Sequence, residues 1–320
     1  MKIKILVTGA AGFIGFNFAI KLLKSTNYSV IGIDNFDNYY SIKLKKNRIK
    51  ELKKFKSFIF HKLDIVNEKS YLTLSKYKFE YIFHFAAQAG VRYSVVNPEK
   101  YISTNILGTI NLLNFVKNQK PKLTFFASSS SVYGDSKKFP LRESDNLNPK
   151  NIYAISKIIN EISAKNYSKF YNLKIYGLRF FTIYGEWGRP DMLLFKILNC
   201  SVKNIKLNLN NNGKHYRDFT YINDVTKILF LLINKKIKKK FDIFNICSNN
   251  PQYIRKIVDI YKKNYGNLKV YKTEKNKLDV FKTHGDNQKI KKILNFKNFT
   301  KLDDGFYNTI NWYKKNISKI

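Results

Sequence analysis

Tyr153 and Lys157 are four positions apart in the stretch NIYAISK, residues 151–157. Four residues make about one helical turn, so the two side chains are expected to share a helix face. A free tyrosine has a pKa of about 10, which is too high for a base near neutral pH. A fixed ammonium group beside the phenol would lower that pKa, and the pair could then transfer a proton. The alternative is an exposed pair without function, because lysine is abundant in this chain.

Gly9, Gly12 and Gly15 follow the apolar run KIKILVTG with a regular three-residue spacing. Glycine lets the backbone turn sharply and come close to a diphosphate, where a Cβ atom would obstruct both. The helix expected after this turn would offer free N–H groups and the positive end of its dipole to the phosphates. The pattern therefore predicts a dinucleotide site.

Two aspartates end the next apolar runs. Asp34 lies 19 positions after Gly15, where a carboxylate can accept hydrogen bonds from both ribose hydroxyls and repels a 2′-phosphate. The cofactor is therefore expected to be NAD rather than NADP. Asp64 ends the third run and is expected to be an acceptor on the adenine side. For both residues the alternative is a helix N-cap.

The first 180 residues alternate short apolar runs with segments of helical periodicity. The expected strands are residues 2–9, 29–34, 57–64, 81–87, 122–130 and 173–180, and the helical segments include 14–26, 97–118 and 153–171. This alternation predicts an α/β fold with a doubly wound parallel Rossmann sheet, whose ligands bind at the carboxyl ends of the strands. We expect residues 1–178, plus about 222–248, to form this domain. Residues 179–221 and 249–320 are expected to form a smaller mixed C-terminal substrate-binding domain.

The chain of 320 residues carries a net charge of +37, which would ordinarily suggest a nucleic-acid or membrane partner. However, the basic residues are spread along the whole chain, and only seven of the 59 are arginine. We interpret them as a solvated surface, with no specific nucleic-acid partner, and the basic stretch 41–56 as an amphipathic surface helix. Cys200 and Cys247 have no metal or disulfide spacing, so we expect no metal and a cytoplasmic location. No apolar stretch approaches the roughly 18 residues of a membrane helix, so no membrane insertion is expected.

The motifs TGAAGFIG, HFAAQAG, SSSSVYG and YAISK resemble those of the extended short-chain dehydrogenases/reductases. The resemblance implies NAD as cofactor, Tyr153 and Lys157 as the proton-transfer pair, and Ser129 as a hydroxyl that shares a hydrogen bond with the oxidised sugar hydroxyl. It also implies a set of cofactor contacts: Gly9, Gly12, Phe13, Ile14, Gly15, Asp34, Asn35, Asp64, Ile65, Phe85, Ala86, Ala87, Asn105, Tyr153, Lys157 and Phe180.

Ser130 and Ser131 distinguish between reactions within this family. Related sugar-nucleotide dehydratases carry an aspartate and a glutamate at these positions, and related decarboxylases carry a glutamate at the second. A hydroxyl group cannot replace a carboxylate as acid or base, so dehydration and decarboxylation are disfavoured. Epimerisation and simple dehydrogenation remain.

Longer stretches resemble UDP-glucuronate 4-epimerases over nearly the full chain. These are DNFDNYYSIKLKKNRI, HFAAQAGVRYSVVNPEKYISTNILGT, GLRFFTIYGEWGRPDMLLFKI and RDFTYINDV. The resemblance implies conversion of UDP-glucuronate to UDP-galacturonate through a transient 4-keto sugar, a homodimer, and a role in polysaccharide biosynthesis.

Four of the seven arginines, Arg92, Arg179, Arg189 and Arg217, fall within the last three of these stretches. A guanidinium fork fits a diphosphate or a carboxylate, although a surface ion pair is the alternative for each of them. The expected substrate contacts are Gln88, Arg92, Ser130, Ser131, Thr182, Arg189 and Arg217. The three hydroxyl residues would hold the substrate carboxylate without protonating it.

One segment departs from the family pattern. Asp279, Val280 and Thr283 match a downstream element, but residues 276–278 read Asn-Lys-Leu where relatives carry Arg/Gln-Pro-Gly. Nucleotide contacts on that side are therefore expected to differ. Three other functions stay open: a 4-epimerase of neutral UDP-hexoses or UDP-N-acetylhexosamines, a stoichiometric 4-dehydrogenase, and a non-catalytic nucleotide- or nucleic-acid-binding protein.

Overall fold

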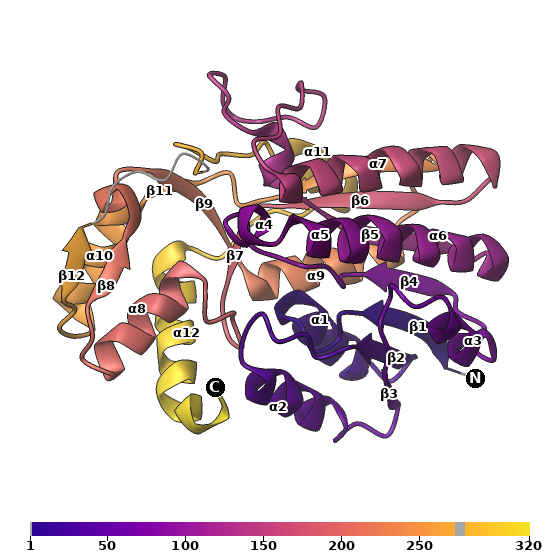
Figure 1. The fold of residues 1–320 in the computed structure, drawn as a ribbon, viewed down its shortest axis with the longest axis horizontal. Coiled ribbons are helices and arrows are strands. Elements are labelled where there is room, and N and C mark those ends of the chain that lie inside the picture. The colour runs from indigo at the N-terminus through magenta and orange to yellow at the C-terminus, as the bar shows by residue number, and fades with distance from the viewer. Residues whose placement is uncertain (1, 273–278) are drawn as a thin grey trace.

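A seven-stranded sheet forms the centre of the larger part of the molecule (Figure 1). This computed structural model describes residues 2–272 and 279–320. The strands lie in the order β10-β6-β5-β4-β1-β2-β3, and all neighbouring pairs are parallel. Their bounds are β1 (Ile3–Thr8), β2 (Tyr28–Asp34), β3 (Phe58–Lys62), β4 (Tyr81–His84), β5 (Leu123–Ser129), β6 (Ile175–Phe180) and β10 (Phe241–Ile246). The prediction of a doubly wound α/β fold is confirmed, and the strand order reverses between β1 and β4, where such sheets bind ligands.

Helices cover both faces of this sheet. One face packs against α1 (Phe13–Leu23), α2 (Ile42–Leu52), α9 (Ile222–Ile233) and α11 (Gln288–Leu294), and the other against α3 (Lys69–Ser75), α6 (Gly108–Gln119) and α7 (Ile152–Phe170). Consecutive strand residues therefore contribute to two separate cores: Ile5 and Val7 to the first, and Leu6 to the second. Burial on both faces explains why the strands read as continuous apolar runs.

The segment before α6 differs from the single helix predicted for residues 97–118. It contains α4 (Tyr93–Val96), α5 (Pro98–Tyr101) and a π-helical turn (Ile102–Leu107). Asn105 lies within the π-turn, where its side chain donates to Gln88 O at 3.1 Å and accepts from Gln88 N at 2.7 Å. A π-turn inserts one residue per turn, and here it directs a polar side chain at the loop after β4.

The smaller part of the molecule lies beyond the carboxyl ends of the large sheet (Figure 1). It contains two small sheets, β11-β9-β7 and β12-β8. Its elements are β7 (Thr182–Tyr184), α8 (Leu193–Val202), β8 (Leu207–Leu209), β9 (Tyr216–Tyr221), β11 (Pro251–Tyr253), α10 (Ile254–Asn264), β12 (Val270–Lys272) and α12 (Leu302–Asn316), with 3₁₀ turns at Asn210–Gly213 and Ile317–Lys319. A further 3₁₀ turn, Ser130–Tyr133, follows β5 of the large sheet. The division into domains at the residues given above stays a prediction.

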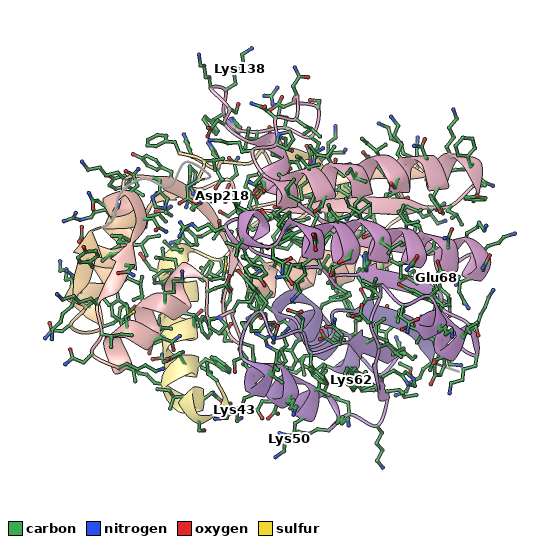
Figure 2. All side chains as sticks on the ribbon, viewed as in Figure 1. Lys43, Lys50, Lys62, Glu68, Lys138 and Asp218 are labelled. Carbon is green, nitrogen blue, oxygen red and sulfur yellow. The ribbon has the colours of Figure 1, made fainter. Side chains whose placement is uncertain are left out.

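Helix α2 departs from the surface helix predicted for residues 41–56. Its exposed lysines, including Lys43 and Lys50, point away from the ribbon, as Lys138 does elsewhere (Figure 2). However, Lys45 and Arg48 are buried among the apolar residues of the opposite face. The helix therefore brings two cations into the interior. In the described parts of the chain, no helix has the length and apolar character needed to cross a membrane.

Candidate active site

A cavity of about 580 Å³ lies at the carboxyl ends of the strands, between the two parts of the molecule. The glycine loop, the ends of β2, β4, β5 and β6, the start of α7 and residues of the smaller part all contribute to its lining. Most of the predicted site residues line it: Gly9, Gly12, Phe13, Ile14, Gly15, Asp34, Asn35, Ile65, Phe85, Ala86, Ala87, Gln88, Arg92, Ser129, Ser130, Ser131, Tyr153, Lys157, Phe180, Thr182, Arg189 and Arg217.

The glycine loop has the close approaches that its sequence predicts. Gly9 has a φ of +70°, and a Cβ atom there would lie 2.7 Å from the backbone nitrogen of Ala86. A Cβ atom on Gly15 would lie 2.2 Å from Gly9 O. Helix α1 begins at Phe13 without a side-chain cap, so the N–H groups of its first turn remain available to an anion. The loop and helix start therefore fit the diphosphate of a dinucleotide.

Asp34 stands at the end of β2, as expected for a ribose-binding carboxylate. Its two oxygens accept hydrogen bonds from Ala11 N at 3.1 Å and Phe36 N at 2.8 Å. Burial raises the pKa of this carboxyl group, while the nearby Lys45 ammonium acts in the opposite direction. Helix α2 starts only at Ile42, so the N-cap interpretation of Asp34 is wrong.

Two predicted cofactor contacts, Asp64 and Asn105, lie behind the cavity wall rather than on it. Asp64 accepts from the Asn35 side chain at 2.9 Å and from Val66 N at 2.9 Å. Asn105 holds the backbone of Gln88 and donates to Ser156 Oγ at 3.0 Å. Each supports a residue or element of the wall, and their contact with a cofactor stays a prediction.

The start of α7 is attached to the end of β5. Asn151 caps the helix by accepting from Ala154 N at 2.9 Å, and Lys157 Nζ donates to Ala127 O at 2.9 Å. The Ser129 hydroxyl lies close enough to the Tyr153 phenol to lower its pKa. Ser129 Oγ also accepts from Ser131 N at 3.1 Å, which fixes the serine turn. The three predicted catalytic side chains therefore meet at one point of the cavity.

The pKa values of the pair differ from the sequence prediction. Burial raises the pKa of Tyr153, and the hydrogen bond from Ser129 lowers it less. Lys157 Nζ lies 5.9 Å from the centre of the Tyr153 ring, and burial lowers its own pKa to about 8, against the attraction of Glu161. The protein alone therefore does not make the phenol acidic, because loss of hydration outweighs the effect of nearby charges.

A buried ion pair lies behind the catalytic residues. Glu161 lies one turn after Lys157 on α7. Its carboxylate accepts hydrogen bonds from Arg179 Nε at 2.9 Å, from Arg179 Nη2 at 2.7 Å and from Ser128 Oγ at 2.5 Å. Arg179 also donates to the Tyr133 hydroxyl at 2.8 Å. The guanidinium fork of Arg179 is therefore engaged by a protein carboxylate and is not free to bind a substrate anion.

The other three motif arginines lie on the cavity wall. Arg92 forms an ion pair with Asp279 at 2.6 Å, across the boundary between the two parts of the molecule. Arg189 forms a two-point pair with Asp191, which also accepts from the Tyr39 hydroxyl at 3.4 Å.

Arg217 completes this set, but its environment differs from that of the two paired arginines. It donates to Tyr216 O at 2.7 Å, and burial lowers its pKa to about 10. Arg92 and Arg189 both form ion pairs, so their guanidinium groups are already partly satisfied, and their contact with a substrate stays a prediction. The departure at residues 276–278 lies outside the described residues.

The sequence reasoning missed several residues of the wall. Lys45 lines the cavity and donates to Asp37 O at 2.5 Å, and Tyr39 and Asp191 lie beside Arg189. Arg48 lies behind the glycine loop. A signal for Arg48 was present, because arginine is rare in this chain and Arg48 falls on the same helix face as Leu44 and Leu52.

The sequence of this chain matches a known protein family and known relatives. The family described as GDP-mannose 4,6 dehydratase matches residues 6–309. The UDP-glucuronate 4-epimerase of Thermodesulfobacterium geofontis is 36% identical over 323 residues, which cover 98% of this chain and 97% of that protein.

Solved structures are also similar to this chain. The UDP-glucuronic acid 4-epimerase from Bacillus cereus, in complex with UDP-glucuronic acid and NAD, has a TM-score of 0.90 and 30% identity and covers 98% of this chain and 99% of its own. The UDP-glucose 4-epimerase from Thermotoga maritima, with UDP-glucose, has a TM-score of 0.89 and 27% identity and covers 98% and 100%.

Proposed function

Since this chain belongs to the GDP-mannose 4,6-dehydratase family, we propose that it is an NAD-dependent 4-epimerase that converts UDP-glucuronate to UDP-galacturonate. The observation that carries the proposal is the meeting of Ser129, Tyr153 and Lys157 with two further serines in one cavity beside the glycine loop. Dehydration would need carboxylates where Ser130 and Ser131 stand. The family name therefore describes ancestry, while the residues support epimerisation.

The residues of the cavity fit NAD. The glycine loop and the start of α1 would hold the diphosphate, and Asp34 would hold the adenosine ribose. When bound, NAD supplies the acceptor for the C4 hydride of the sugar, returns that hydride, and adds a positive charge that favours the phenolate. Lys157 lines the same wall and would hydrogen-bond the nicotinamide ribose.

Tyr153 performs the proton transfer in this proposal. Its phenol takes the proton of the C4 hydroxyl, with Ser129 sharing the hydrogen bond, and later gives it back. Lys157 stabilises the deprotonated phenol from the next turn of α7. Between the two transfers the 4-keto sugar rotates about its bonds to the diphosphate and presents its other face. The proton and hydride that leave the sugar both return to it, so the sugar is neither oxidised nor reduced overall.

The substrate carboxylate is the basis for choosing UDP-glucuronate. Ser130, Ser131 and Thr182 line the cavity and offer hydroxyl donors to a carboxylate at C5. Neutral donors hold the carboxylate without protonating it. This matters because the 4-keto intermediate is a β-keto acid, which loses CO₂ easily when its carboxylate is twisted or desolvated. Arg189 and Arg217 add positive charge on the same wall, which suits the diphosphate and the uronate.

A neutral UDP-hexose is the second candidate substrate. The structural similarity to the UDP-glucose 4-epimerase from Thermotoga maritima favours it, because the fold and coverage are nearly equal to those of the uronate enzyme. The two substrates differ by one carboxylate at C5. Recognition of that group by the serine pair is what separates the candidates.

Product analysis tests the proposal. Purified protein is incubated separately with UDP-glucuronate and UDP-glucose, and the products are separated by anion-exchange chromatography. We expect UDP-galacturonate from the first and much slower formation of UDP-galactose from the second. The reverse preference would contradict the uronate assignment, and net accumulation of NADH would indicate a dehydrogenase. A Ser130→Ala/Ser131→Ala variant is expected to lose the preference for the uronate.

We infer a homodimer from the surface of the helices next to the large sheet. Ile155 and Ile162 are exposed on α7, and Ile102 and Leu107 are exposed on the adjoining π-turn. A second copy that packs the same helices against them would cover these side chains. An Ile162→Glu variant is expected to be monomeric by light scattering. The cytoplasm, where NAD and UDP-sugars are available, is the location that suits this reaction.

A further inference from the structure

Arg48 is a fully buried arginine that the proposed reaction does not use. It lies on α2 with an exposed fraction of 0%. Its guanidinium group lies between the glycine loop and the segment 185–192, which we call the substrate loop because it carries Arg189. Arginine keeps its charge under all ordinary conditions, so a cation is fixed between these two loops.

One side of the guanidinium group holds the glycine loop. Arg48 Nη1 donates to Ala11 O at 2.7 Å and to the Tyr40 hydroxyl at 2.8 Å. Ala11 N in turn donates to Asp34, the predicted ribose-binding carboxylate. The position of the loop that would carry the cofactor diphosphate therefore depends directly on Arg48.

The other side of the guanidinium group holds the substrate loop. Arg48 Nη2 donates to Trp187 O at 2.5 Å and to Gly188 O at 3.2 Å. Asn17 of α1 donates to Glu186 O at 3.3 Å. Side chains from the first two helices therefore bind three successive carbonyl groups just before Arg189.

The substrate loop has a conformation that needs such support. Trp187 has a φ of 59°, in the left-handed region that non-glycine residues rarely adopt. Its ring packs against Phe16 of α1 and Trp312 of α12, with centroid distances of 5.0 Å to each. These apolar contacts fix the ring, and Arg48 fixes the carbonyl group of the same residue.

The hydrogen-bonding partners of Arg48 are chemically unusual for a buried cation. Within residues 2–272 and 279–320, they are three carbonyl oxygens and one hydroxyl group, and none is a carboxylate. Burial of a cation is costly, and the Asp34 carboxylate attracts Arg48 without a direct hydrogen bond to it. A lysine would bring the same charge with a single nitrogen, which cannot reach both loops in a fork geometry. The planar fork is therefore the property that this position uses.

We propose that Arg48 is a positioning residue that clamps the glycine loop to the substrate loop, so that cofactor binding also orders the residues before Arg189. Opening of the substrate loop breaks the bonds from Arg48 to Trp187 and Gly188. A cofactor that fixes the glycine loop makes this opening less frequent. The clamp acts with any UDP-sugar, so it does not depend on the assignment of the substrate.

Hydrogen exchange tests the clamp without any turnover. Protein freed of NAD is compared with NAD-bound protein, and amide exchange is followed by mass spectrometry for peptides covering residues 9–16 and 185–192. In the wild type we expect NAD to slow exchange in both peptides. Unchanged exchange in 185–192, while 9–16 becomes protected, would overturn the proposal without the use of any variant.

An Arg48→Lys variant separates the fork from the charge. We expect NAD to protect residues 9–16 in this variant but no longer 185–192. KM for the UDP-sugar should rise roughly tenfold with a smaller change in kcat, because binding is weakened before chemistry. Arg255→Lys, on the exposed face of α10, is the matched control and should behave as the wild type. Equal protection of 185–192 in Arg48→Lys and the wild type would show a structural role only and overturn the clamp.

Discussion

Two ion pairs illustrate how differently the two walls of the cavity are built. On the catalytic wall, Glu161 and Arg179 are 8% and 4% exposed, and two hydrogen bonds join them. On the substrate wall, Arg92 and Asp279 are 42% and 20% exposed, and one contact joins them. The first pair joins α7 to β6 of the seven-stranded part, and the second bridges the two parts of the molecule.

The difference follows the demands of each wall. Proton transfer needs fixed geometry, and three successive residues of β5 supply it: Ala127 binds Lys157, Ser128 binds Glu161, and Ser129 faces Tyr153. The substrate wall must admit and release a sugar nucleotide, and its two ion pairs, Arg92–Asp279 and Arg189–Asp191, lie on loops with partial access to solvent. The residues fixed for proton transfer and the more exposed residues that would bind the substrate therefore lie on opposite sides of one cavity.

Removal of the Tyr153 hydroxyl is expected to have the largest effect. A Tyr153→Phe variant should lose about 10³-fold or more in kcat, because general acid–base transfer contributes about 10²–10⁴-fold. NAD should still bind, since the glycine loop is untouched, and the melting temperature should change little. Turnover is measured by chromatography of UDP-sugars and NAD content by absorbance of the denatured supernatant. An active variant would move the proton transfer to another residue.

Neutralisation of Glu161 tests how much the buried ion pair of the catalytic wall contributes to stability. A Glu161→Gln variant should lower the free energy of unfolding by about 3–5 kcal/mol, because Arg179 is left as an unpaired buried cation. Urea unfolding measures this loss. Glu51→Gln, which removes a carboxylate from a largely exposed cluster with Lys54 and Lys319, is the control and should change stability little. Equal losses of stability in the two variants would show that the Glu161–Arg179 pair contributes no more than an exposed ion pair.

Lys157 makes the free energy of unfolding of the protein dependent on pH. Its pKa is about 8 in the folded protein and 10.5 without perturbation. Below pH 8 both states hold the proton, and the cost of burying the charge is fully present. Between pH 8 and 10.5 only the unfolded state holds it, so this cost disappears as the pH rises.

A comparison with Lys157→Met isolates this contribution. Relative to the variant, the wild type should gain about 3 kcal/mol between pH 7 and pH 10.5, since one pKa unit corresponds to about 1.4 kcal/mol. Urea unfolding of both proteins across this range measures the difference. A constant difference would mean that Lys157 is not desolvated in the folded protein.

The smallest effect is expected at the exposed pair. An Asp279→Asn variant should change the free energy of unfolding by less than about 1 kcal/mol, because partly exposed pairs are screened by water. The same urea measurement applies. A loss as large as that of Glu161→Gln would show that the Arg92 contact is a structural link between the two parts of the molecule.

Most of the predictions made from the sequence rest on local residue patterns. Glycine spacing, Asp34 at a strand end, and the Tyr153–Lys157 interval all lie within single strand–turn–helix units, where distance along the chain determines distance in space. The parallel sheet followed from apolar runs and was confirmed strand by strand.

Long-range pairing explains what the sequence could not predict. Arg179 and Glu161 are 18 positions apart and meet only because β6 packs beside α7. Arg48 reaches Trp187 over 139 positions. The position of Arg48 on the face of Leu44 and Leu52 indicates burial, but it does not indicate which loop the guanidinium group contacts. The pKa of Tyr153 also could not be predicted from the sequence, because burial is the largest influence on it and burial is a property of the folded protein.

Transfer of deuterium tests the central claim most directly. UDP-glucuronate carrying deuterium at C4 is incubated with the protein in ordinary water, and the product is examined by NMR and mass spectrometry. If the hydrogen leaves C4 and returns to it within the closed cavity, UDP-galacturonate will keep the deuterium at C4. Loss of the label to water, or the absence of any C4 epimer, would contradict the account.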